Sequence, residues 1–323
     1  MPDRPRALVV GAGISGIACA AALAARGFVV EVRERGRAVG GRMASRRMLD
    51  SGTDFDGRHV DIGASYFTAS DPDFVEVVRT LQRAGIVEEW TDGFHVAGPD
   101  GLAGIRVGPM RYRAPGGLRS VVDHLSRGLS VRLATPVLEV VDEGTHVVAD
   151  GEEFDVAAIC APGPQAQRIL RPACVPRELT DLAWEPVICV TLAFDERTWR
   201  DLDGVFVNDD PVITWIADDG RRRGDGAPVL TAHVHPVLAA RHLQDPESVL
   251  PPVIGAVRRV LEMSDLPVWT DVHRWTFAKP MTAHERPYWS KGRLGAAGDA
   301  FAGGPRVESA WMSGNSLGQA LVG

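Results

Sequence analysis

The sequence of 323 residues is poor in cysteine, and it lacks the residue spacings of a metal site. Its four cysteines are widely spaced and form no CxxC pair: Cys19, Cys160, Cys174 and Cys189. This spacing excludes the disulfide framework of a small secreted domain, and we predict reduced thiols in a cytoplasmic protein. His233 and His235 form an HxH pair without an HExxH motif or a cysteine cluster, so we predict no metal.

Lysine and net positive charge are also scarce. Lys279 and Lys291 are the only lysines, and 35 basic against 42 acidic side chains leave a formal net charge of −7. A negative protein repels phosphate backbones, which argues against nucleic acid as a partner. The apolar share of 45% and the charged share of 24% exclude a disordered or collagen-like chain.

A charge-free run over residues 7–25 follows a basic start and imitates a signal peptide or a short membrane span. Three glycines at fixed spacing inside the run argue against both interpretations. We interpret the run as strand, turn and helix, and we predict no membrane anchor.

The turn in this run is a GxGxxG motif. An apolar, β-branched strand is predicted over 6–10, and an alanine-rich helix over 17–26 ends at Gly27. The motif itself lies between them, and its residues are Gly11, Ala12, Gly13, Ile14, Ser15 and Gly16. The first glycine permits a tight turn, the second lets backbone approach a pyrophosphate, and the third allows close packing of helix on strand. The free N–H groups of the first helical turn receive the anion.

A second strand over 28–32 leads to Glu34, which follows Gly11 by 23 residues. This spacing is typical of the carboxylate that binds a ribose 2′-hydroxyl, although a solvated acid at a strand end is the alternative. Arg35 follows directly, and the segment then ends in Gly40, Gly41 and Arg42. The paired glycines allow a second backbone approach to the pyrophosphate, and the guanidinium supplies a charge for it. This extension favours FAD over NAD as the bound dinucleotide.

By Arg42 the sequence resembles the flavin amine oxidase superfamily, and further segments are similar to its renalase-like branch. Residues 61–68, DIGASYFT, resemble a D-x-G-A-Q-Y-F-T segment in which Ser65 replaces glutamine. Residues 112–118, Trp275 in RWTFAKP, and residues 298–310 resemble later segments of the same branch. The resemblance covers nearly the whole chain and is thin between about 168 and 271.

The resemblance implies an oxidase with non-covalent FAD. It implies that the cofactor contacts beyond the first motifs are Gly63, Ala64, Ser65, Val137, Gly298, Asp299, Val307, Glu308 and Ala310. Asp299 is placed to accept a hydrogen bond from the ribityl chain. Residues 307–310 are predicted to precede a helix through Leu317 and Leu321, whose N-terminus would stabilise negative charge on the flavin ring.

The predicted fold is α/β, with a Rossmann-type FAD-binding domain of the glutathione reductase/p-hydroxybenzoate hydroxylase kind. An interleaved, mainly antiparallel α+β substrate domain completes it. We assign 1–70, 115–165 and 280–323 to the first domain, and 71–114 and 166–279 to the second. Within the second we predict an amphipathic helix over 73–84, a hairpin within 90–110, strands over 187–194, 212–216 and 229–234, and a helix over 246–263.

Three aromatic residues and a histidine are candidate walls of the substrate pocket: Tyr66, His233, Trp275 and Trp289. The tryptophans could equally be core residues, and His233 could be a hydrogen-bonded core histidine. Residues 221–224, RRRG, are predicted to be a solvated loop tip, with an anion contact for a dinucleotide substrate as the alternative.

Three functions remain open from the sequence. Renalases oxidise dihydro-NAD(P) isomers that carry the hydride at the 2 or 6 ring position, and they pass the electrons to O2 as hydrogen peroxide. A flavin amine oxidase, or a small-metabolite oxidase or desaturase, is the second possibility. A protein that holds FAD or a dinucleotide without catalysis is the third. The expected partners are a small molecule and O2, and the protein is a monomer or a homodimer.

Overall fold

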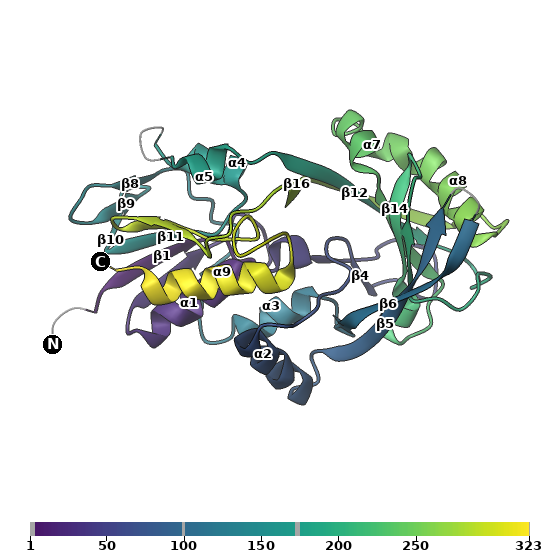
Figure 1. Cartoon of the computed structure of the whole chain (residues 1–323), viewed down its shortest axis with the longest axis horizontal. Helices are drawn as coiled ribbons and strands as arrows, with labels where there is room; N and C mark the ends of the chain where they lie inside the picture. Colours follow the sequence, from purple (N-terminus) through teal and green to yellow (C-terminus); the bar gives the residue numbers. More distant parts are fainter. Residues whose placement is uncertain (1–3, 99–100, 172–174, 323) are drawn as a thin grey trace.

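The computed structural model describes residues 4–98, 101–171 and 175–322. Figure 1 shows two lobes, each built on its own sheet. The sheet of the first lobe has six strands in the order β17–β18–β11–β1–β2–β7. These strands are β1 (Arg6–Val10), β2 (Val29–Arg33), β7 (Ser130–Arg132), β11 (Val156–Ile159), β17 (Trp289–Lys291) and β18 (Leu294–Ala296).

Neighbouring strands of this sheet pair in parallel, except β17, which is antiparallel to β18. Ala7, Leu8 and Val9 are fully buried because both faces of β1 are covered, as the apolar run predicts. β11 pairs in parallel with β1, so the chain returns to the same sheet after the intervening segments. A three-stranded antiparallel sheet lies beside it: β8 (Val140–Asp142), β9 (Val147–Ala149) and β10 (Glu152–Phe154).

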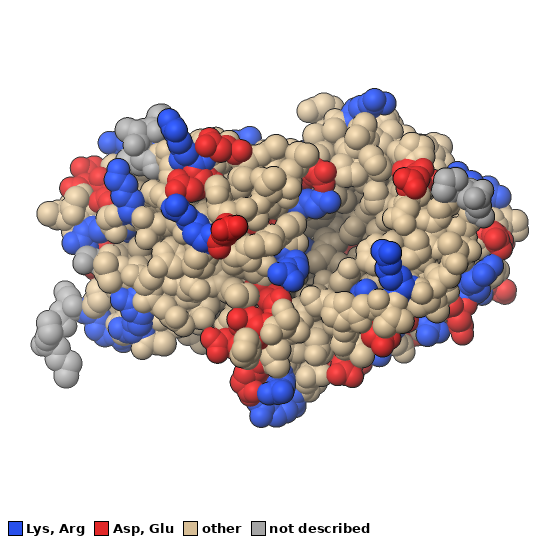
Figure 2. Space-filling model, in the orientation of Figure 1, with Lys and Arg blue, Asp and Glu red and all other residues tan. Residues whose placement is uncertain are grey.

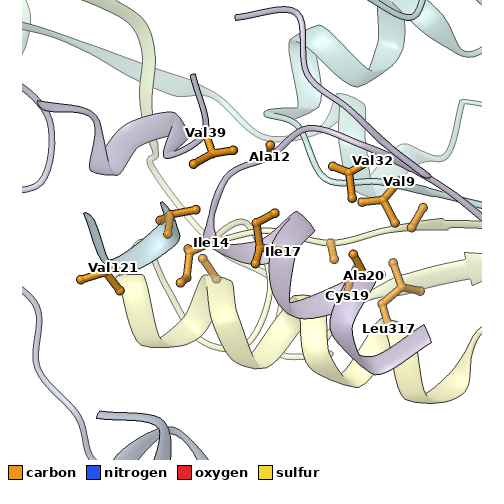
Figure 3. Packing of buried hydrophobic residues seen from close by; sticks show 14 of the residues in the cluster. Val9, Ala12, Ile14, Ile17, Cys19, Ala20, Val32, Val39, Val121 and Leu317 are labelled. Atoms are coloured by element: carbon orange, nitrogen blue, oxygen red, sulfur yellow. The ribbon is translucent and has the colours of Figure 1, made fainter. Parts of the chain in front are cut away.

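The first lobe is held together by close packing of α1 (Ile14–Ala25) against α9 (Val307–Ala320), which lie side by side in Figures 1 and 3. Glycines allow this approach. A Cβ added at Gly314 would lie 1.9 Å from the Ser15 carbonyl oxygen, and one added at Gly318 would lie 2.5 Å from that of Cys19. The charge-free run 7–25 is therefore a buried strand, turn and helix, as predicted.

The amphipathic helix predicted over 73–84 is α2 (Pro72–Arg83). Asp71 caps it by accepting hydrogen bonds from the backbone N–H groups of Asp73 and Phe74. Its apolar face packs in the core of the first lobe, where the Phe74 ring lies 5.4 Å from that of Trp311 on α9. This helix, which the predicted boundary at residue 71 assigns to the second domain, therefore packs in the core of the first lobe. A periodic apolar face does not tell which core it covers.

The second lobe contains a seven-stranded sheet in the order β16–β12–β15–β14–β13–β5–β6. Only β5 and β13 pair in parallel among its described neighbours. Its strands are β5 (Glu88–Gly98), β6 (Gly101–Arg113), β12 (Trp184–Ala193), β13 (Gly204–Val207), β14 (Ile213–Asp218), β15 (Val229–Val234) and β16 (Trp269–Pro280). The predicted α/β class with a mainly antiparallel second sheet is confirmed.

Helices cover one face of this second sheet: α7 (Pro236–Arg241), η3 (Pro246–Val249) and α8 (Leu250–Leu261). The helix predicted over 246–263 is thus divided into a 3-10 turn and an α-helix, with Pro251 and Pro252 in the first turn of α8. The remaining elements are η1 (Gly41–Met43), α3 (Arg119–Leu125), α4 (Gly163–Ile169), α5 (Arg177–Thr180), and a two-stranded sheet of β3 (Ser45–Arg47) and β4 (His59–Asp61).

The solvated loop tip predicted over 221–224 is wrong. Residues Asp219–Arg223 form a short helix, α6, in which Arg222 is fully buried and Arg223 is 8% exposed. Arg222 pairs with Asp219, and Arg223 contacts Asp61 of β4 at 2.7 Å. Arg222 and Arg223 are buried because Asp219 and the distant Asp61 neutralise them, and the local sequence cannot reveal the contact with Asp61.

Candidate functional site

A cavity of about 1350 Å³ lies between the lobes, and Figure 2 shows the surface hollowed there. Its size exceeds the roughly 300–1,000 Å³ typical of a pocket for one small ligand. Its described lining comes from the β1–α1 turn, the segment that follows β2, strand β16 and the start of α9. Segments distant in sequence therefore meet around one elongated space.

The GxGxxG turn has the conformation that its glycines predict. Gly11 has a φ of +104°, and a Cβ there would lie 2.6 Å from the Cys160 carbonyl oxygen. A Cβ on Gly16 would lie 1.9 Å from the Gly11 carbonyl oxygen. Gly16 therefore packs the helix against the turn and does not itself line the cavity, whereas Gly11, Gly13, Ile14 and Ser15 do.

The first turn of α1 has unused polar groups. Gly13, its N-cap, has no side-chain capping bond, and the buried Ser15 hydroxyl has no hydrogen-bond partner within the described ranges. Helix N-termini attract anions because their free N–H groups point outward along the helix dipole. This end of the cavity therefore fits the phosphate groups of a dinucleotide.

The segment with Gly40 and Gly41 lies directly against the GxGxxG turn of residues 11–16, and we call these two segments the glycine arms. The Gly40 N–H donates to the Ala12 carbonyl at 2.9 Å, and a Cβ added at Gly41 would lie 3.3 Å from the Gly13 Cα. Side chains on the two glycine arms would fill the space that now lies open between them. The Glu34 carboxylate accepts from the Ala12 and Gly36 N–H groups at 2.9 and 2.7 Å. Glu34 and Arg35 also line the cavity.

Arg42 and Asp299, predicted to contact different parts of the cofactor, form a bidentate ion pair in this structure. The two N–H···O distances are 2.7 and 2.6 Å, and the guanidinium also donates to the Ala278 carbonyl at 3.0 Å. Both residues line the cavity, as do Val137, Gly298, Val307 and Ala310. Val307 begins α9, so residues 307–310 are its first turn instead of preceding it.

Besides Gly16, two predicted cofactor contacts lie outside the cavity lining, Ser65 and Glu308. The Ser65 hydroxyl accepts a hydrogen bond from Trp215 Nε1 at 2.9 Å. Glu308 is 2% exposed and accepts from the Ser70 hydroxyl at 2.9 Å and the Asp71 N–H at 2.7 Å. Hydrogen bonds to Asp71 and Ser70 hold the Glu308 pKa below its usual range although burial opposes this. Both side chains therefore stabilise loops beside the cavity.

Trp289 is not a pocket wall. It lies on β17 in the hydrophobic core of the first lobe and is 9% exposed. The sequence allowed either placement, because strand aromatics are common in cores. Tyr66, His233 and Trp275 do line the cavity.

One face of the second sheet forms a wall of the cavity. Cys189 of β12 is opposite both His273 of β16 and His233 of β15, and Val187 is opposite Trp275. Residues opposite one another in neighbouring strands point to the same face. Trp275 also donates from Nε1 to the Ile62 carbonyl at 2.6 Å, next to Gly63 and Ala64 in the lining.

Sequence reasoning missed His273 and Arg46. The alternation of Asp271, His273 and Trp275 is a period-two pattern that could have placed them on one strand face. Arg46 of β3 donates to both oxygens of Asp271 at 2.9 Å and lies 2.9 Å from His273 Nδ1. A guanidinium cannot accept a hydrogen bond, so His273 Nδ1 is the acceptor and its proton is on Nε2.

Both histidines of this wall are neutral at pH 7. Burial lowers the pKa of His233 to about 4, and the charge of Arg222 adds to the effect while a hydrogen bond with Gly63 opposes it. Burial and the charge of Arg46 lower the pKa of His273 to about 4, against the opposing charge of Asp271. The wall therefore has no imidazolium ion.

We expect acid to destabilise the protein through His233. Its folded pKa of about 4 lies below the ordinary value of 6.5, so the unfolded chain binds more protons between these pH values. Stability should fall as the pH drops through this window. Urea denaturation of the holoprotein measures the free energy of unfolding at pH 7 and at pH 4.5. Between these pH values it should fall by about 2 kcal/mol less in His233→Gln than in the wild type. Equal drops in both proteins would contradict the assignment.

The cavity is positive although the protein is negative. Of the described residues that line it, ten are cationic and two, Glu34 and Asp299, are carboxylates. The cations are Lys279 and nine arginines: Arg33, Arg35, Arg42, Arg46, Arg47, Arg119, Arg168, Arg274 and Arg306. Five of them form no ion pair with the described carboxylates: Arg35, Arg47, Arg119, Arg168 and Arg274. The cavity is therefore suited to anions.

Other features predicted from the sequence are placed as follows. Cys19, Cys160 and Cys189 are free thiols, and Cys174 lies outside the described residues. No helix within the described ranges has the length and apolarity needed to cross a membrane. The predicted FAD contacts, the domain boundaries and the oligomeric state stay predictions at this point.

Comparisons with known proteins place the chain among redox enzymes. A family model described as an NAD(P)-binding Rossmann-like domain matches residues 9–81, and one described as a flavin containing amine oxidoreductase matches residues 96–319. Renalase from Mus musculus is 24% identical over 334 residues, covering 92% of this chain and 93% of the mouse protein.

Solved structures share the fold at low sequence identity. A protein from Exiguobacterium sp. 255-15, assigned as a protoporphyrinogen oxidase, has a TM-score of 0.77 at 15% identity, over 98% of each chain. Wild-type putrescine oxidase bound to putrescine has a TM-score of 0.73 at 16% identity, over 97% of this chain and 98% of the other.

Proposed function

This chain belongs to the family of flavin-containing amine oxidoreductases, as a renalase-like member, and we propose that it oxidises isomeric dihydro-NAD(P). In the proposed reaction a 2- or 6-dihydropyridine ring loses a hydride and becomes aromatic. O2 takes up that hydride together with one proton and becomes hydrogen peroxide. The products are NAD(P)⁺ and hydrogen peroxide, so atoms and electrons balance.

The cofactor is FAD, which when bound supplies the two-electron acceptor that the side chains lack. The two facing glycine arms fit this cofactor, and so does the Ser15 hydroxyl at the start of α1, which has no hydrogen-bond partner among the described residues. We propose that this first turn holds the pyrophosphate and that Glu34 holds the adenosine ribose. Arg42, Asp299 and the first turn of α9 would hold the flavin half.

The charge of the cavity is the observation that carries the choice of substrate. A pyrophosphate from the cofactor needs few of the ten cations. A second, anionic dinucleotide would use charges that the cofactor leaves free, among them four lining arginines that have no ion pair with a described carboxylate: Arg35, Arg47, Arg119 and Arg168. A protonated amine would be repelled by the same field.

The protonation of the wall supports the same choice. A dihydropyridine that gives up hydride needs no general base, and His233 and His273 are weakly basic because burial lowers the pKa of each to about 4. Lys279 is paired with Glu185 at 2.8 Å. We propose that these side chains orient the ring and exclude water while moving no proton.

Anaerobic mixing with candidate substrates tests the proposal. We expect 2- or 6-dihydro-NAD(P) to bleach the yellow flavin band within seconds, and O2 to restore the band with one hydrogen peroxide formed per substrate oxidised. A panel of amines that includes putrescine should leave the band unchanged.

The control is 4-dihydro-NAD(P), which has the same charge and differs in the position of the hydride. Bleaching by amines and not by any dihydro-dinucleotide would select the amine oxidase alternative. A protein that binds FAD but is reduced by none of these compounds would favour the non-catalytic alternative.

A further inference from the structure

Two arginines of the cavity lining, Arg47 and Arg119, start from the same side of the small β3–β4 sheet. Arg47 of β3 is opposite His59 of β4, and two residues earlier Ser45 is opposite Asp61. These four side chains share one face of the sheet, because opposite and alternate residues point the same way. The start of α3 covers this face, where the Arg119 N–H donates to the Ser45 hydroxyl at 3.4 Å.

The carboxylate on this face, Asp61, is occupied by other groups. It is 2% exposed and accepts from the Ser45 hydroxyl at 2.6 Å and from the Leu118 N–H at 2.9 Å. It also pairs with Arg223 at 2.7 Å. Among the described residues, neither of the two lining arginines forms an ion pair with it or with another carboxylate. Two positive charges therefore lie on one side of this sheet without a negative partner.

Arg119 is the more deeply placed of the two. A Cβ added at Gly40 would lie 3.3 Å from the Arg119 Cγ, so the stem of this side chain packs against the second glycine arm. Its Nε is buried and has no hydrogen-bond partner among the described residues. Buried donors in native proteins nearly always have an acceptor, so this guanidinium fits an acceptor supplied by a ligand.

Arg47 is oriented from behind by a neutral histidine. Its Nε lies 3.3 Å from His59 Nε2, and because a guanidinium can only donate, the imidazole proton is on Nδ1. Burial lowers the pKa of His59, and the charges of nearby arginines lower it further. The other N–H groups of Arg47 have no acceptor within the part of the chain that the structure describes, so they are available to a ligand.

We propose that Arg47 and Arg119 bind a phosphate group of the dinucleotide substrate, apart from the phosphates of the cofactor. The proposal rests on the proposed function, because it takes dihydro-NAD(P) as the substrate. Two guanidinium groups without a carboxylate repel one another, and a phosphate that accepts from both removes this repulsion. The substrate has two such groups: the bridging pyrophosphate, which NAD and NADP share, and the 2′-phosphate, which only NADP has.

The first test measures phosphate binding to the FAD-loaded protein without using activity. Calorimetric titration with 2′-AMP represents the 2′-phosphate, and titration with inorganic pyrophosphate represents the bridging group. The wild type should bind at least one of them. Arg47→Met and Arg119→Met should each weaken that binding by about tenfold, the effect of losing a hydrogen bond to a charged group. Because Arg47 is exposed, Arg47→Met gives an answer even if Arg119→Met does not fold.

Arg79→Met on α2 is the matched control for the loss of one positive charge. Arg79 pairs with Glu76 at the surface at 3.5 Å and lies outside the cavity lining. This variant should bind both probes within about twofold of the wild type. Arg47→Lys keeps the charge and should retain part of the affinity. Equal effects of Arg79→Met and Arg47→Met would show that only net charge was measured, and would overturn the site.

The second test measures kcat and KM with dihydro-NAD, dihydro-NADP and the matching dihydronicotinamide riboside, which has no phosphate. In Arg47→Met we expect the KM of a dinucleotide to rise by about tenfold with little change in kcat, because the phosphate contact is the same before and during hydride transfer. The riboside should react as with the wild type, within about twofold. A loss confined to dihydro-NADP assigns the 2′-phosphate, and equal losses with both dinucleotides assign the bridging pyrophosphate.

The two tests separate this site from the cofactor and from the proposed function. A wild type that binds neither probe, or equal losses for dinucleotides and riboside, would overturn the proposal. A lower flavin-to-protein ratio in Arg47→Met and Arg119→Met would place these arginines at the cofactor and would also overturn it. If no dihydro compound reduces the flavin while both variants still weaken probe binding, the proposed function fails and the phosphate site stands.

Discussion

Arg222→Met is expected to lower the free energy of unfolding by about 3–5 kcal/mol, the usual cost of breaking a buried ion pair. Arg222 is fully buried and pairs with Asp219, which is also fully buried. Its guanidinium donates to the Ser65 carbonyl at 3.1 Å and so connects α6 to the loop that carries Tyr66. Removal of the guanidinium leaves the Asp219 carboxylate with one positive partner fewer, and the Ser65 carbonyl loses this hydrogen-bond donor.

Arg221→Met is the matched control, because the neighbouring side chain is 40% exposed and pairs with Asp203 at the surface. We expect it to change stability by no more than about 1 kcal/mol. Urea denaturation of both holoproteins, beside the wild type, gives the comparison. Equal effects of the two substitutions would show that the α6 network does not stabilise the fold.

The pH dependence of the same pair has a defined sign. The charges of Arg223, Arg222 and Arg58 hold the Asp219 pKa below its usual range, although burial opposes them. The stabilisation is therefore present above the ordinary aspartate pKa of about 4 and is lost as the pH falls below it. The difference in the free energy of unfolding between the wild type and Arg222→Met should therefore shrink as the pH falls below about 4.

Gly16→Ala is expected to weaken FAD binding at least about tenfold, which corresponds to about 1.4 kcal/mol. The added Cβ would lie 1.9 Å from the Gly11 carbonyl oxygen, so backbone of the phosphate-binding turn must shift. Overpacking of this kind typically costs about 1–3 kcal/mol. The measurement is the flavin-to-protein ratio after gel filtration, followed by titration of the apoprotein with FAD.

Gly255→Ala on α8 is the control for this substitution, since no described heavy atom lies within 4 Å of its added Cβ. It should retain FAD and gain a few tenths of a kcal/mol from helix propensity, at most about 1 kcal/mol. Wild-type affinity in Gly16→Ala would show that this turn is not the FAD site. Loss of FAD in both variants would point to general instability.

The first lobe could be predicted well because its signals are local. The strand over 6–10, the glycine turn and the helix to Ala25 depend on residues adjacent in sequence, and each glycine reports its own steric requirement. Glu34 and Gly41 lie close enough in sequence to the turn for spacing to place them in the same cavity. The substrate wall depends instead on register between β12, β15 and β16, which local patterns do not specify.

The sequence by itself determined the α/β class, the dinucleotide turn and the family, because these depend on short-range sterics and on motifs whose residues are near neighbours. The tertiary structure decided which charges are buried and which aromatic rings face the cavity. Arg222 and Trp289 were misplaced for the same reason: desolvation and pairing act between residues distant in the chain. Arg222 and Arg223 can be buried because folding brings Asp61, a carboxylate distant in the chain, to them.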